Sequence, residues 1–437
     1  MKEVLLKNFK KISSIPRKSG HEEKIADFLC DIAKKNDLYF YRDDINNVII
    51  KKKGNLDGEP IAFQSHLDMV CVKTEESNHD FERDGIEILI NGDEVTAKDT
   101  SLGADQGIGL AIMLSLIENT KIKHPDIEFL FTSEEETTFN GAINFPYSKL
   151  ESKRMINLDN SKDNSVYIGA EGNICNEDIY EGSKINTNIS AYKIKINGFL
   201  GGNSGENVNL SKNNAITTMA NLLIGRDILL AQINGGTFEN DIATSCEIII
   251  NTYEDVYSIF KSYNAKIERI INTKSFNKDD TQHILNQIIE LESGFILQGE
   301  ASANLGKIET IDDKVIIKYI FRSNSEEKLQ EIYNKTINLK NNFSAKELYR
   351  DPIWEADENS EILNKYNQVY FNEYGEYPTN EIYIGSIECA SIKKRIEGLD
   401  IISIGSNMED FHTTKEITYI SSWCKIYNLL IKLLEII

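Results

Sequence analysis

The sequence has little of three things: paired cysteines, long apolar runs and excess positive charge. Its six cysteines form no Cys-x-x-Cys pair, and most lie in apolar runs, which is typical of reduced, buried thiols in a cytoplasmic protein. No apolar run approaches the roughly 18 residues of a membrane span, and residues 1–15 lack the continuous apolar core of a signal peptide. The formal net charge of −21 repels phosphate backbones and anionic lipids, so we expect no nucleic acid and no membrane as a partner.

Common catalytic motifs are absent as well. The chain contains no His-Glu-x-x-His motif, which argues against one large class of zinc peptidases. It also contains no Gly-x-Ser-x-Gly nucleophile elbow and no phosphate-binding P-loop. The chemistry must therefore be sought in other combinations of residues, to which only six histidines can contribute.

The chain is long enough for two or three domains, with 437 residues of which 41% are hydrophobic. In residues 1–183 strand-like and helix-like segments alternate, and this pattern returns in residues 382–437, which predicts one layered α/β domain. Its predicted strands are 46–54, 59–66, 126–135, 153–160 and 400–406, and its predicted helices are 21–35, 105–119 and 420–437.

Residues 184–381 differ from the flanking sequence and hold few clustered acids or histidines. The predicted strands of this segment are 189–199, 246–254 and 314–323, and its predicted helices are 213–230, 255–272, 281–293 and 326–342. This is α+β material, so we expect an insert between two parts of the α/β domain.

Polar residues follow the apolar strands of the α/β part. His66 and Asp68 stand at the end of one strand, where residues two apart point to the same side, so Asp68 could orient the His66 imidazole. Two unrelated surface residues at a polar strand end are an equal alternative. Asp105 stands between two glycines at the start of a predicted helix, where a plain helix cap is the alternative.

Further acids and a second histidine occupy similar positions. Glu134, Glu135 and Glu136 follow an apolar strand directly, whereas a run of charges is usually a solvated loop. Asp159 ends another apolar strand, and His412 lies in a loop after the last one. Ligand-binding residues of α/β sheets gather at the carboxyl ends of the strands, so we expect these side chains to meet.

Such a set of side chains predicts a metal site. Mixed imidazole and carboxylate ligands suit zinc, manganese or cobalt. The number of carboxylates suits two ions rather than one, with one acid bridging them. Two ions roughly 3.5–4 Å apart polarise a carbonyl and ionise a shared water.

The segments SHLDMV, LGADQGIG, TSEEE, NLD and FHTTKE, in this order, resemble the di-zinc metallopeptidases that include peptidase T, carboxypeptidase G, aminoacylases and carnosinases. The subfamily of aminoacyl-histidine (Xaa-His) dipeptidases is the most similar, through residues 78–109 and 398–416. The resemblance covers essentially the whole chain and is thin in the insert. It implies a zinc-peptidase-like α/β catalytic domain, which has a mixed sheet with helices on both faces, and an inserted α+β lid or dimerisation domain.

The resemblance also implies ligand roles for matching residues. His66 and Asp159 would bind one metal ion, Glu136 and His412 would bind the other, and Asp105 would bridge the two. The expected cofactors are two divalent ions, with zinc as the first choice and manganese or cobalt as alternatives.

Two catalytic roles follow from the same resemblance. Asp68 would clamp His66, and Glu135 would be the general base that takes a proton from the attacking water and passes it to the leaving amine. Glu134 is the alternative base if the register of the acidic run is shifted by one residue.

The insert departs from the family pattern where the substrate is held. Asn203 replaces the histidine of the usual Gly-Gly-His-Ser-Gly motif, and it can donate a hydrogen bond but cannot carry positive charge. Glu239 replaces a basic residue, while the neighbouring Asn240 is kept as in the family. Ile384 replaces a histidine of the dipeptidases. Arg322 matches the family and would bind a substrate carboxylate, with a surface ion pair as the alternative.

These observations predict a cytoplasmic metallopeptidase that cleaves dipeptides, of the Xaa-His type by resemblance, and whose insert mediates homodimerisation or mimics it. One alternative keeps the chemistry and changes the substrate to another dipeptide, a tripeptide or an N-acyl amino acid. The other is a binding or regulatory homologue that keeps the metals and has weak turnover.

Overall fold

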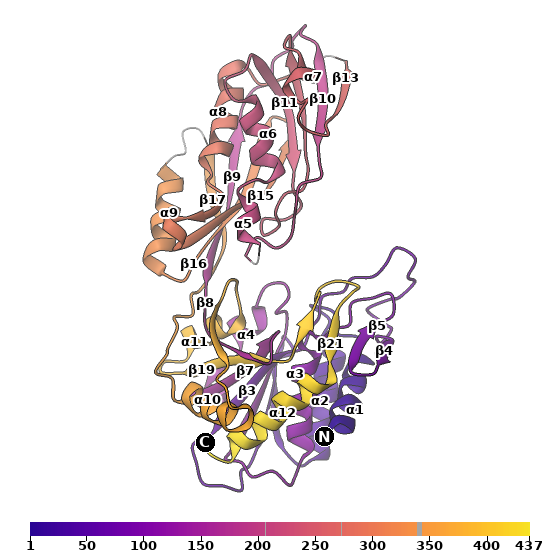
Figure 1. Ribbon diagram of the computed structural model, residues 1–437, viewed down its shortest axis with the longest axis vertical. Helices are drawn as coiled ribbons and strands as arrows, with labels where there is room; N and C mark the ends of the chain where they lie inside the picture. Colours follow the sequence, from indigo (N-terminus) through magenta and orange to yellow (C-terminus); the bar gives the residue numbers. More distant parts are fainter. Residues whose placement is uncertain (206, 272, 339–342) are drawn as a thin grey trace. The chain divides into compact units, whose positions relative to one another are not determined.

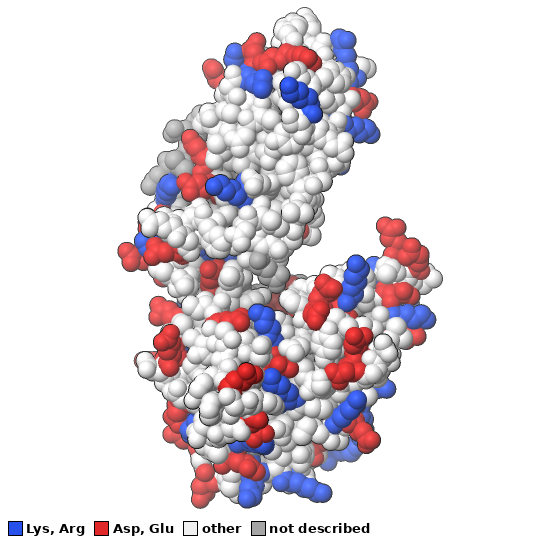
Figure 2. All heavy atoms as spheres, in the orientation of Figure 1, with Lys and Arg blue, Asp and Glu red and all other residues white. Residues whose placement is uncertain are grey.

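The computed structural model describes residues 1–205, 207–271, 273–338 and 343–437, which form two compact units (Figure 1). The first unit consists of Met1–Gly169, Ala356–Tyr383 and Ile387–Ile437. The second unit consists of Ala170–Glu355 and Ile384–Ser386. Acidic and basic side chains are interspersed over the visible face of the first unit, whereas on the visible face of the second unit they lie mainly towards its ends (Figure 2). Among the described residues, no helix has the length and apolar character needed to cross a membrane.

The first unit is built on an eight-stranded mixed sheet. Its strand order is β1-β2-β6-β3-β7-β19-β8-β18, and the four strands β6, β3, β7 and β19 in its middle run parallel. The strands are β1 (Tyr39–Arg42), β2 (Val48–Lys52), β3 (Ile61–His66), β6 (Ile127–Thr132), β7 (Arg154–Asn160), β8 (Ser165–Ala170), β18 (Thr379–Tyr383) and β19 (Asp400–Gly405).

Helices cover both faces of this sheet. One face shares a hydrophobic core with α1 (Lys2–Ser13), α2 (Glu23–Lys35), α3 (Ala104–Glu118), α10 (Glu361–Tyr374) and α12 (Ile420–Leu434). Helix α3 is apolar on nearly all sides, as a helix in the middle of a core must be, and its residues 106–117 are buried. Helix α11 (Glu388–Arg395), which packs against α4 (Asn140–Asn144), lies on the opposite face, where Glu388 contacts Gln64 of β3.

A small antiparallel sheet completes the first unit. Its order is β20-β21-β5-β4, and the strands are β4 (Ile88–Asn91), β5 (Glu94–Ala97), β20 (Met408–Glu409) and β21 (Ile417–Tyr419). The chain between β20 and β21 contains His412, so this sheet holds both ends of the loop that carries that histidine.

The second unit has a nine-stranded antiparallel sheet with helices packed on it. Its main order is β13-β10-β12-β11-β15-β16-β9-β17, and β14 pairs with β15. The strands are β9 (Gly172–Glu181), β10 (Ala191–Ile196), β11 (Ile228–Gly235), β12 (Cys246–Thr252), β13 (Lys266–Ile270), β14 (Gly294–Ile296), β15 (Ala301–Ile311), β16 (Lys314–Ser323) and β17 (Phe343–Asp351). The helices are α5 (Val208–Ser211), α6 (Ala215–Leu223), α7 (Val256–Ile259), α8 (Lys278–Glu290) and α9 (Glu326–Asn338).

The expected fold class, an α/β domain with an α+β insert, is confirmed, but the boundaries between the units lie elsewhere than at 184 and 381. Strand β9 pairs along its whole length with β16 and β17, so residues 170–183 belong with the second sheet. At the other end, α10 buries Ile362, Leu363 and Tyr366 in the core of the first unit, and residues 356–381 therefore belong there.

Two helix predictions in the insert were too long. The helix predicted over 213–230 ends at Leu223, because Gly225 adopts a positive φ of 73° and the apolar residues from Ile228 onward form β11. Of the helix predicted over 255–272, the described residues 255–271 contain only α7 as a helix, and residues 266–270 pair with β10 as β13. The last four residues of the helix predicted over 326–342 lie outside the described residues.

Candidate metal centre

The predicted ligands come from five separate loops or strand ends of the first unit. His66 is the last residue of β3, Asp159 lies one residue before the end of β7, and Glu136 lies in the loop that follows β6. Asp105 is the second residue of α3, and His412 lies between β20 and β21. Strands β3, β6 and β7 are parallel neighbours, so their carboxyl ends deliver these side chains to one edge of the sheet.

The five side chains form a continuous series with Asp105 in the middle. Asp159 Oδ1 lies 3.8 Å from His66 Nε2, which lies 3.0 Å from Asp105 Oδ1. The other oxygen, Asp105 Oδ2, lies 3.3 Å from His412 Nε2, which lies 3.1 Å from Glu136 Oε2. Each oxygen of one carboxylate therefore faces a different histidine, as a bridging ligand requires.

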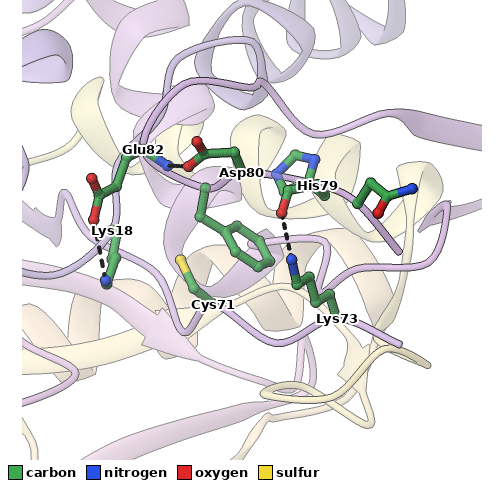
Figure 3. Close-up of a pocket in the computed structure, with 8 residues that line it drawn as sticks. Lys18, Cys71, Lys73, His79, Asp80 and Glu82 are labelled. Atoms are coloured by element: carbon green, nitrogen blue, oxygen red, sulfur yellow. Dashed lines mark hydrogen bonds and ion pairs between the residues drawn. The ribbon is translucent and has the colours of Figure 1, made fainter. Parts of the chain in front are cut away.

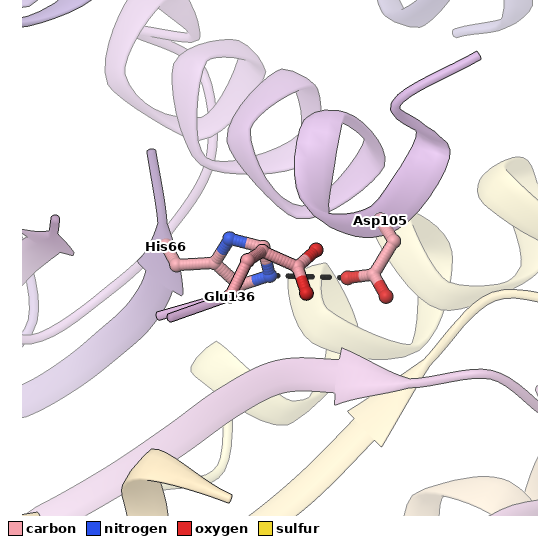
Figure 4. Close-up of side chains that lie close together, drawn as sticks. All are labelled: His66, Asp105 and Glu136. Atoms are coloured by element: carbon pink, nitrogen blue, oxygen red, sulfur yellow. Dashed lines mark hydrogen bonds and ion pairs between the residues drawn. The ribbon is translucent and has the colours of Figure 1, made fainter. Parts of the chain in front are cut away.

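Three of these residues satisfy the geometry of a metal-binding group by themselves. Ligand atoms of His66, Asp105 and Glu136 all lie within 4.8 Å of one another, and Figure 4 shows the three side chains converging. Glu136 Oε1 is buried and has no hydrogen-bond partner in the structure. An unpartnered buried carboxylate oxygen is costly unless a cation or donor meets it, so this group could hold a metal ion.

The histidines are strongly perturbed by the acids around them. Burial opposes their charge, but the carboxylates outweigh it: the pKa of His66 lies well above 6.5, and hydrogen bonds to Asp105 and Glu136 raise the pKa of His412 to about 11. Burial alone would raise the pKa of Asp105, yet its hydrogen bonds to the two histidines lower it below its ordinary value. In the absence of a metal, protons on the imidazoles therefore supply the positive charge that this site needs.

The remaining acids hold protons more strongly than usual. Burial, followed by repulsion from Asp105, raises the pKa of Asp159 well above its ordinary value, and burial likewise raises the pKa of Glu135 and of Glu136. Glu135 Oε2 lies 4.0 Å from His66 Nε2, so this side chain faces the cluster. A carboxylate with a raised pKa next to a candidate metal site is suited to accept and return a proton.

Glu134 is oriented differently from its two neighbours. Its carboxylate accepts hydrogen bonds from Thr138 Oγ1 (3.0 Å) in the same loop and from Asn140 Nδ2 (3.3 Å) at the start of α4, which follows that loop. Its backbone has a positive φ of 55°, which separates its direction from that of the next residues. The structure therefore brings Glu135 and Glu136, but not Glu134, to the cluster.

Asp68 lies beside His66, as expected, and also holds the loop after β6, which the sequence did not predict. Its Oδ1 lies 3.4 Å from His66 Nδ1, on the side of the ring away from the cluster. The same carboxylate accepts backbone hydrogen bonds from Glu135 (3.0 Å) and Glu136 (3.1 Å), and one from Ser19 Oγ (2.7 Å). Asp68 therefore connects the end of β3 to the loop after β6.

A buried polar layer lies beneath the cluster, on the same face of the sheet. Glu388 Oε2 accepts hydrogen bonds from Gln64 Nε2 (2.6 Å) and Thr132 Oγ1 (2.7 Å). Asn157 donates to Gln64 Oε1 (2.6 Å) and accepts from Ser403 Oγ (2.5 Å). Burial raises the pKa of Glu388 to about 7. This layer joins β3, β6, β7 and β19 directly below the ends that carry or precede the ligands.

Sequence reasoning missed this layer and three other buried residues. Arg17 donates to the backbone oxygens of Leu67 (3.1 Å) and Asp68 (2.5 Å), and Glu22 accepts from the backbone N–H of Glu134 (3.1 Å). Gln106 donates to Asp159 Oδ1 (2.7 Å). Arg17 lies in a segment without a recognisable pattern, and Glu22 stands at the polar start of the helix predicted over 21–35, so no signal in the single sequence pointed to a role for either.

The predicted substrate-binding residues gather in the second unit. Ser204 links them, because its hydroxyl accepts from Arg322 Nη1 (2.9 Å) and its backbone N–H donates to the carbonyl of Asn240 (2.8 Å). Asn203 Oδ1 accepts from the backbone N–H of Gly205 (2.8 Å). Arg322 is only 5% exposed, which excludes the surface ion pair considered for it.

A separate pocket of about 430 Å³ lies in the first unit (Figure 3). Both lysines of its lining already have partners. Lys73 Nζ donates to the carbonyl of His79 (2.8 Å), and Lys18 Nζ lies 3.6 Å from Glu82. The lining residues are Lys18, Cys71, Lys73, Asn78, His79, Asp80, Phe81 and Glu82, and they include none of the candidate metal ligands.

The fold and the cluster together define a class: an α/β domain that presents imidazole and carboxylate ligands at the carboxyl ends of parallel strands, as metallohydrolases do. Comparisons with known proteins agree with this class. The model of Peptidase family M28 matches residues 47–216. The cytosol non-specific dipeptidase of Escherichia coli K12 is 27% identical to this chain, over 98% of this chain and 96% of its own length.

Two solved structures resemble this chain over nearly its whole length. The crystal structure of aminoacylhistidine dipeptidase from Vibrio alginolyticus has a TM-score of 0.82 at 27% identity and covers 99% of this chain and 96% of its own. The structure of aminopeptidase PepT from Bacillus cereus shares the fold, with a TM-score of 0.62 at 16% identity over 100% of this chain and 98% of its own. The resemblance seen in the sequence motifs is thereby confirmed, since this chain is similar to known dipeptidases over nearly its whole length.

The perturbed histidines predict how the stability of the metal-free protein depends on pH. The pKa of His412 is raised from 6.5 to about 11 in the folded state, so its stabilising contribution is complete below pH 6.5 and is lost as the pH rises towards 11. We expect the free energy of unfolding of the chelated protein, measured with urea, to fall steadily from pH 6.5 to pH 9.

The His412→Ala variant should show a smaller slope over the same range. Added zinc should stabilise the wild-type protein more at pH 8 than at pH 6, because protons compete with the metal for the same atoms. A chelated wild-type protein whose stability is constant or rises over this range would contradict the raised imidazole pKa values.

Proposed function

We propose that this protein is a metallopeptidase that hydrolyses dipeptides with the help of two divalent metal ions. The observation that carries the proposal is the position of Asp105, whose two carboxylate oxygens face His66 and His412 from opposite sides. In this proposal His66 and Asp159 hold one ion, and Glu136 and His412 hold the other. Zinc is the first choice for both positions, with manganese or cobalt as alternatives.

Bound ions of this kind would polarise the scissile carbonyl and acidify a water molecule between them. The residues of the chain perform the other tasks. Glu135 accepts a proton from the attacking water and delivers it to the amine that leaves, and its carboxylate faces the cluster, 4.0 Å from His66 Nε2. Asp68 fixes the His66 ring from behind and holds the backbone of Glu135 and Glu136 at the same time.

The proposed substrates are dipeptides, although the same chemistry could hydrolyse other amide bonds. The two relatives that are 27% identical to this chain are called a non-specific dipeptidase and an aminoacylhistidine dipeptidase, so cleavage of dipeptides is common to both names and Xaa-His preference is not. In this chain Arg322 binds the substrate carboxylate, and Asn203 and Asn240 hold the scissile carbonyl region. Asn203, Glu239 and Ile384, which replace a histidine, a basic residue and a second histidine, favour a changed preference within this class.

Three further properties are part of the proposal. The second unit acts as a lid and offers a surface for homodimerisation, as the resemblance implies. The protein works in the cytoplasm, which is supported by its free, mostly buried cysteines and by its similarity to the cytosol non-specific dipeptidase of Escherichia coli. Its partner is a small peptide, and its acidic surface disfavours nucleic acid and membranes.

The first experiment is a hydrolysis panel with zinc, manganese or cobalt added and with chelator as the control. It contains β-alanyl-histidine, Xaa-His dipeptides, other dipeptides, a tripeptide and an N-acetyl amino acid. We expect chelator-sensitive cleavage of dipeptides, with Xaa-His among them. Cleavage of N-acetyl amino acids alone would instead support the alternative substrate, and binding of two metals with no cleavage would support the weakened homologue.

A second prediction separates the general base from the ligands. Glu135→Gln should keep two metals per chain and lower kcat by about 10²–10⁴-fold, because it removes proton transfer and leaves the ligands in place. Glu134→Gln is the matched control, since Glu134 bonds to Thr138 and Asn140, and its kcat should stay within a few-fold of wild type. If the control loses activity and Glu135→Gln does not, the base is Glu134.

A third prediction concerns the altered lid motif. Asn203→His restores the residue type that relatives carry, and a histidine can place positive charge near the developing oxyanion. We expect kcat on dipeptides to rise if the natural Asn203 weakens catalysis. An unchanged kcat together with an altered order of preferred dipeptides would show instead that the lid has been adapted to another substrate. Comparing kcat/KM across the panel for the two proteins distinguishes these results.

A further inference from the structure

Glu416 makes an unusual set of contacts next to the candidate metal centre. Its Oε2 accepts hydrogen bonds from the backbone N–H groups of Leu102 (2.7 Å) and Gly103 (3.0 Å). Its Oε1 accepts from those of Ala104 (2.8 Å) and Asp105 (3.3 Å). The residue is only 3% exposed, so one buried carboxylate holds four consecutive backbone donors, the last of which belongs to the central candidate ligand.

The turn that Glu416 holds is sterically confined, and its N–H groups need acceptors from outside the helix that follows. Gly103 has a positive φ of 68°, and a side chain there would lie 2.5 Å from Arg17 Nη2 and 2.8 Å from Met69 Sδ. Helix α3 begins at the next residue, and the first N–H groups of a helix have no partner within the helix. A carboxylate at this position satisfies them and interacts favourably with the helix dipole.

Arg17 supplies the opposite charge in this buried region. Its guanidinium donates to the carbonyl of Gly103 and to those of Leu67 and Asp68. Burial lowers the pKa of Arg17, and the charges of Asp68 and Glu416 oppose that shift. The turn before Asp105 is thus held by Glu416 through its N–H groups and by Arg17 through a carbonyl oxygen.

Glu416 is also connected to the second histidine. It follows His412 by four residues, and its backbone N–H donates to the carbonyl of Thr413 (3.4 Å). Thr413 in turn donates through Oγ1 to the carbonyl of Asp410 (2.6 Å) and accepts from the N–H of Lys415 (3.1 Å). His412 itself has a positive φ of 64°, a conformation that this closed loop must maintain.

We propose that Glu416 is a positioning residue that places the Asp105 carboxylate between the two metal positions and ties it to the His412 loop. The proposal rests on the proposed function, because it assigns Glu416 a task only if Asp105 is shared by two ions. It follows that loss of Glu416 weakens both metal positions together. Loss of His412, in contrast, removes a ligand from only one of them.

The test compares Glu416→Gln with Glu128→Gln. Glu128 is an equally buried glutamate of the first unit that accepts backbone N–H bonds from Glu151 and Ser152 (2.7–3.1 Å) and has no contact with a candidate ligand. Cobalt is titrated into the metal-free proteins, and its affinity, stoichiometry and visible absorption spectrum are recorded. Thermal unfolding of each metal-free protein and kcat with excess cobalt are measured alongside.

We expect Glu416→Gln to bind both cobalt ions about 10–100-fold more weakly and with an altered spectrum, because the neutral amide offers one acceptor oxygen where the carboxylate offers two. Glu128→Gln should lose thermal stability yet keep wild-type affinity and spectrum. His412→Ala should weaken one ion only. Glu416→Asp retains the charge on a shorter arm, so it should restore part of the affinity and also serves if Glu416→Gln does not fold.

Two results would overturn the role of Glu416. One is wild-type affinity and spectrum in Glu416→Gln, and the other is an equal loss of affinity in Glu128→Gln, which would indicate general destabilisation. A wild-type protein that binds fewer than two cobalt ions would instead contradict the proposed function itself, so the two failures can be told apart.

Discussion

The repulsion among four carboxylates at one edge of a sheet is the constraint around which the first unit is organised. Asp105 of α3, Glu135 and Glu136 of the loop after β6 and Asp159 of β7 are brought together, and burial makes their mutual repulsion stronger than it would be in water. Cations, or protons taken up by the acids themselves, relieve this repulsion. Two imidazoles lie among the acids and bind protons more tightly than usual, and a divalent ion would replace those protons with a more concentrated charge.

The cluster also has to be held against its own repulsion, and buried charges around it do this through the backbone. Asp68 binds the N–H groups of the loop after β6, and Glu416 binds those of the turn before α3. Arg17 donates to the carbonyl oxygens of Leu67 and Asp68, which follow β3. Because a carboxylate accepts several hydrogen bonds and a guanidinium donates several, each buried charge fixes a stretch of chain rather than one side chain.

Much of the first unit could be predicted from the sequence, since its strands are short apolar runs and each ends in a polar residue of obvious chemistry. His66 and Asp159 could be predicted in this way, and Asp105 and His412 by their positions at a helix start and in a loop after an apolar strand. The acidic run was ambiguous by one residue, because nothing in a linear sequence shows that the backbone of Glu134 turns its side chain towards the start of α4.

Other features depend on contacts that a single sequence does not display. Arg17 and Glu416 act on backbone atoms of residues distant along the chain, so their partners carry no distinctive side chains. The same reason explains the misplaced unit boundaries: β9 looks like any other strand until its pairing with β16 and β17 is known. The overlong helix at 213–230 merged a helix and a strand that are both apolar and are separated only by a short turn at Gly225.

The polar layer beneath the cluster has a consequence for how the ligands are spaced. Gln64 and His66 are two residues apart on β3, as are Asn157 and Asp159 on β7, so layer and ligands share one face of the sheet. Gln64 lies directly opposite Asn157 in the pairing of these parallel strands. A slip by one residue would place Phe63 or Ser65 in the layer and turn His66 to the wrong face. The hydrogen bonds of the layer therefore fix the register of β3 against β7. The spacing of His66 and Asp159 is thus set by strand pairing before any metal binds.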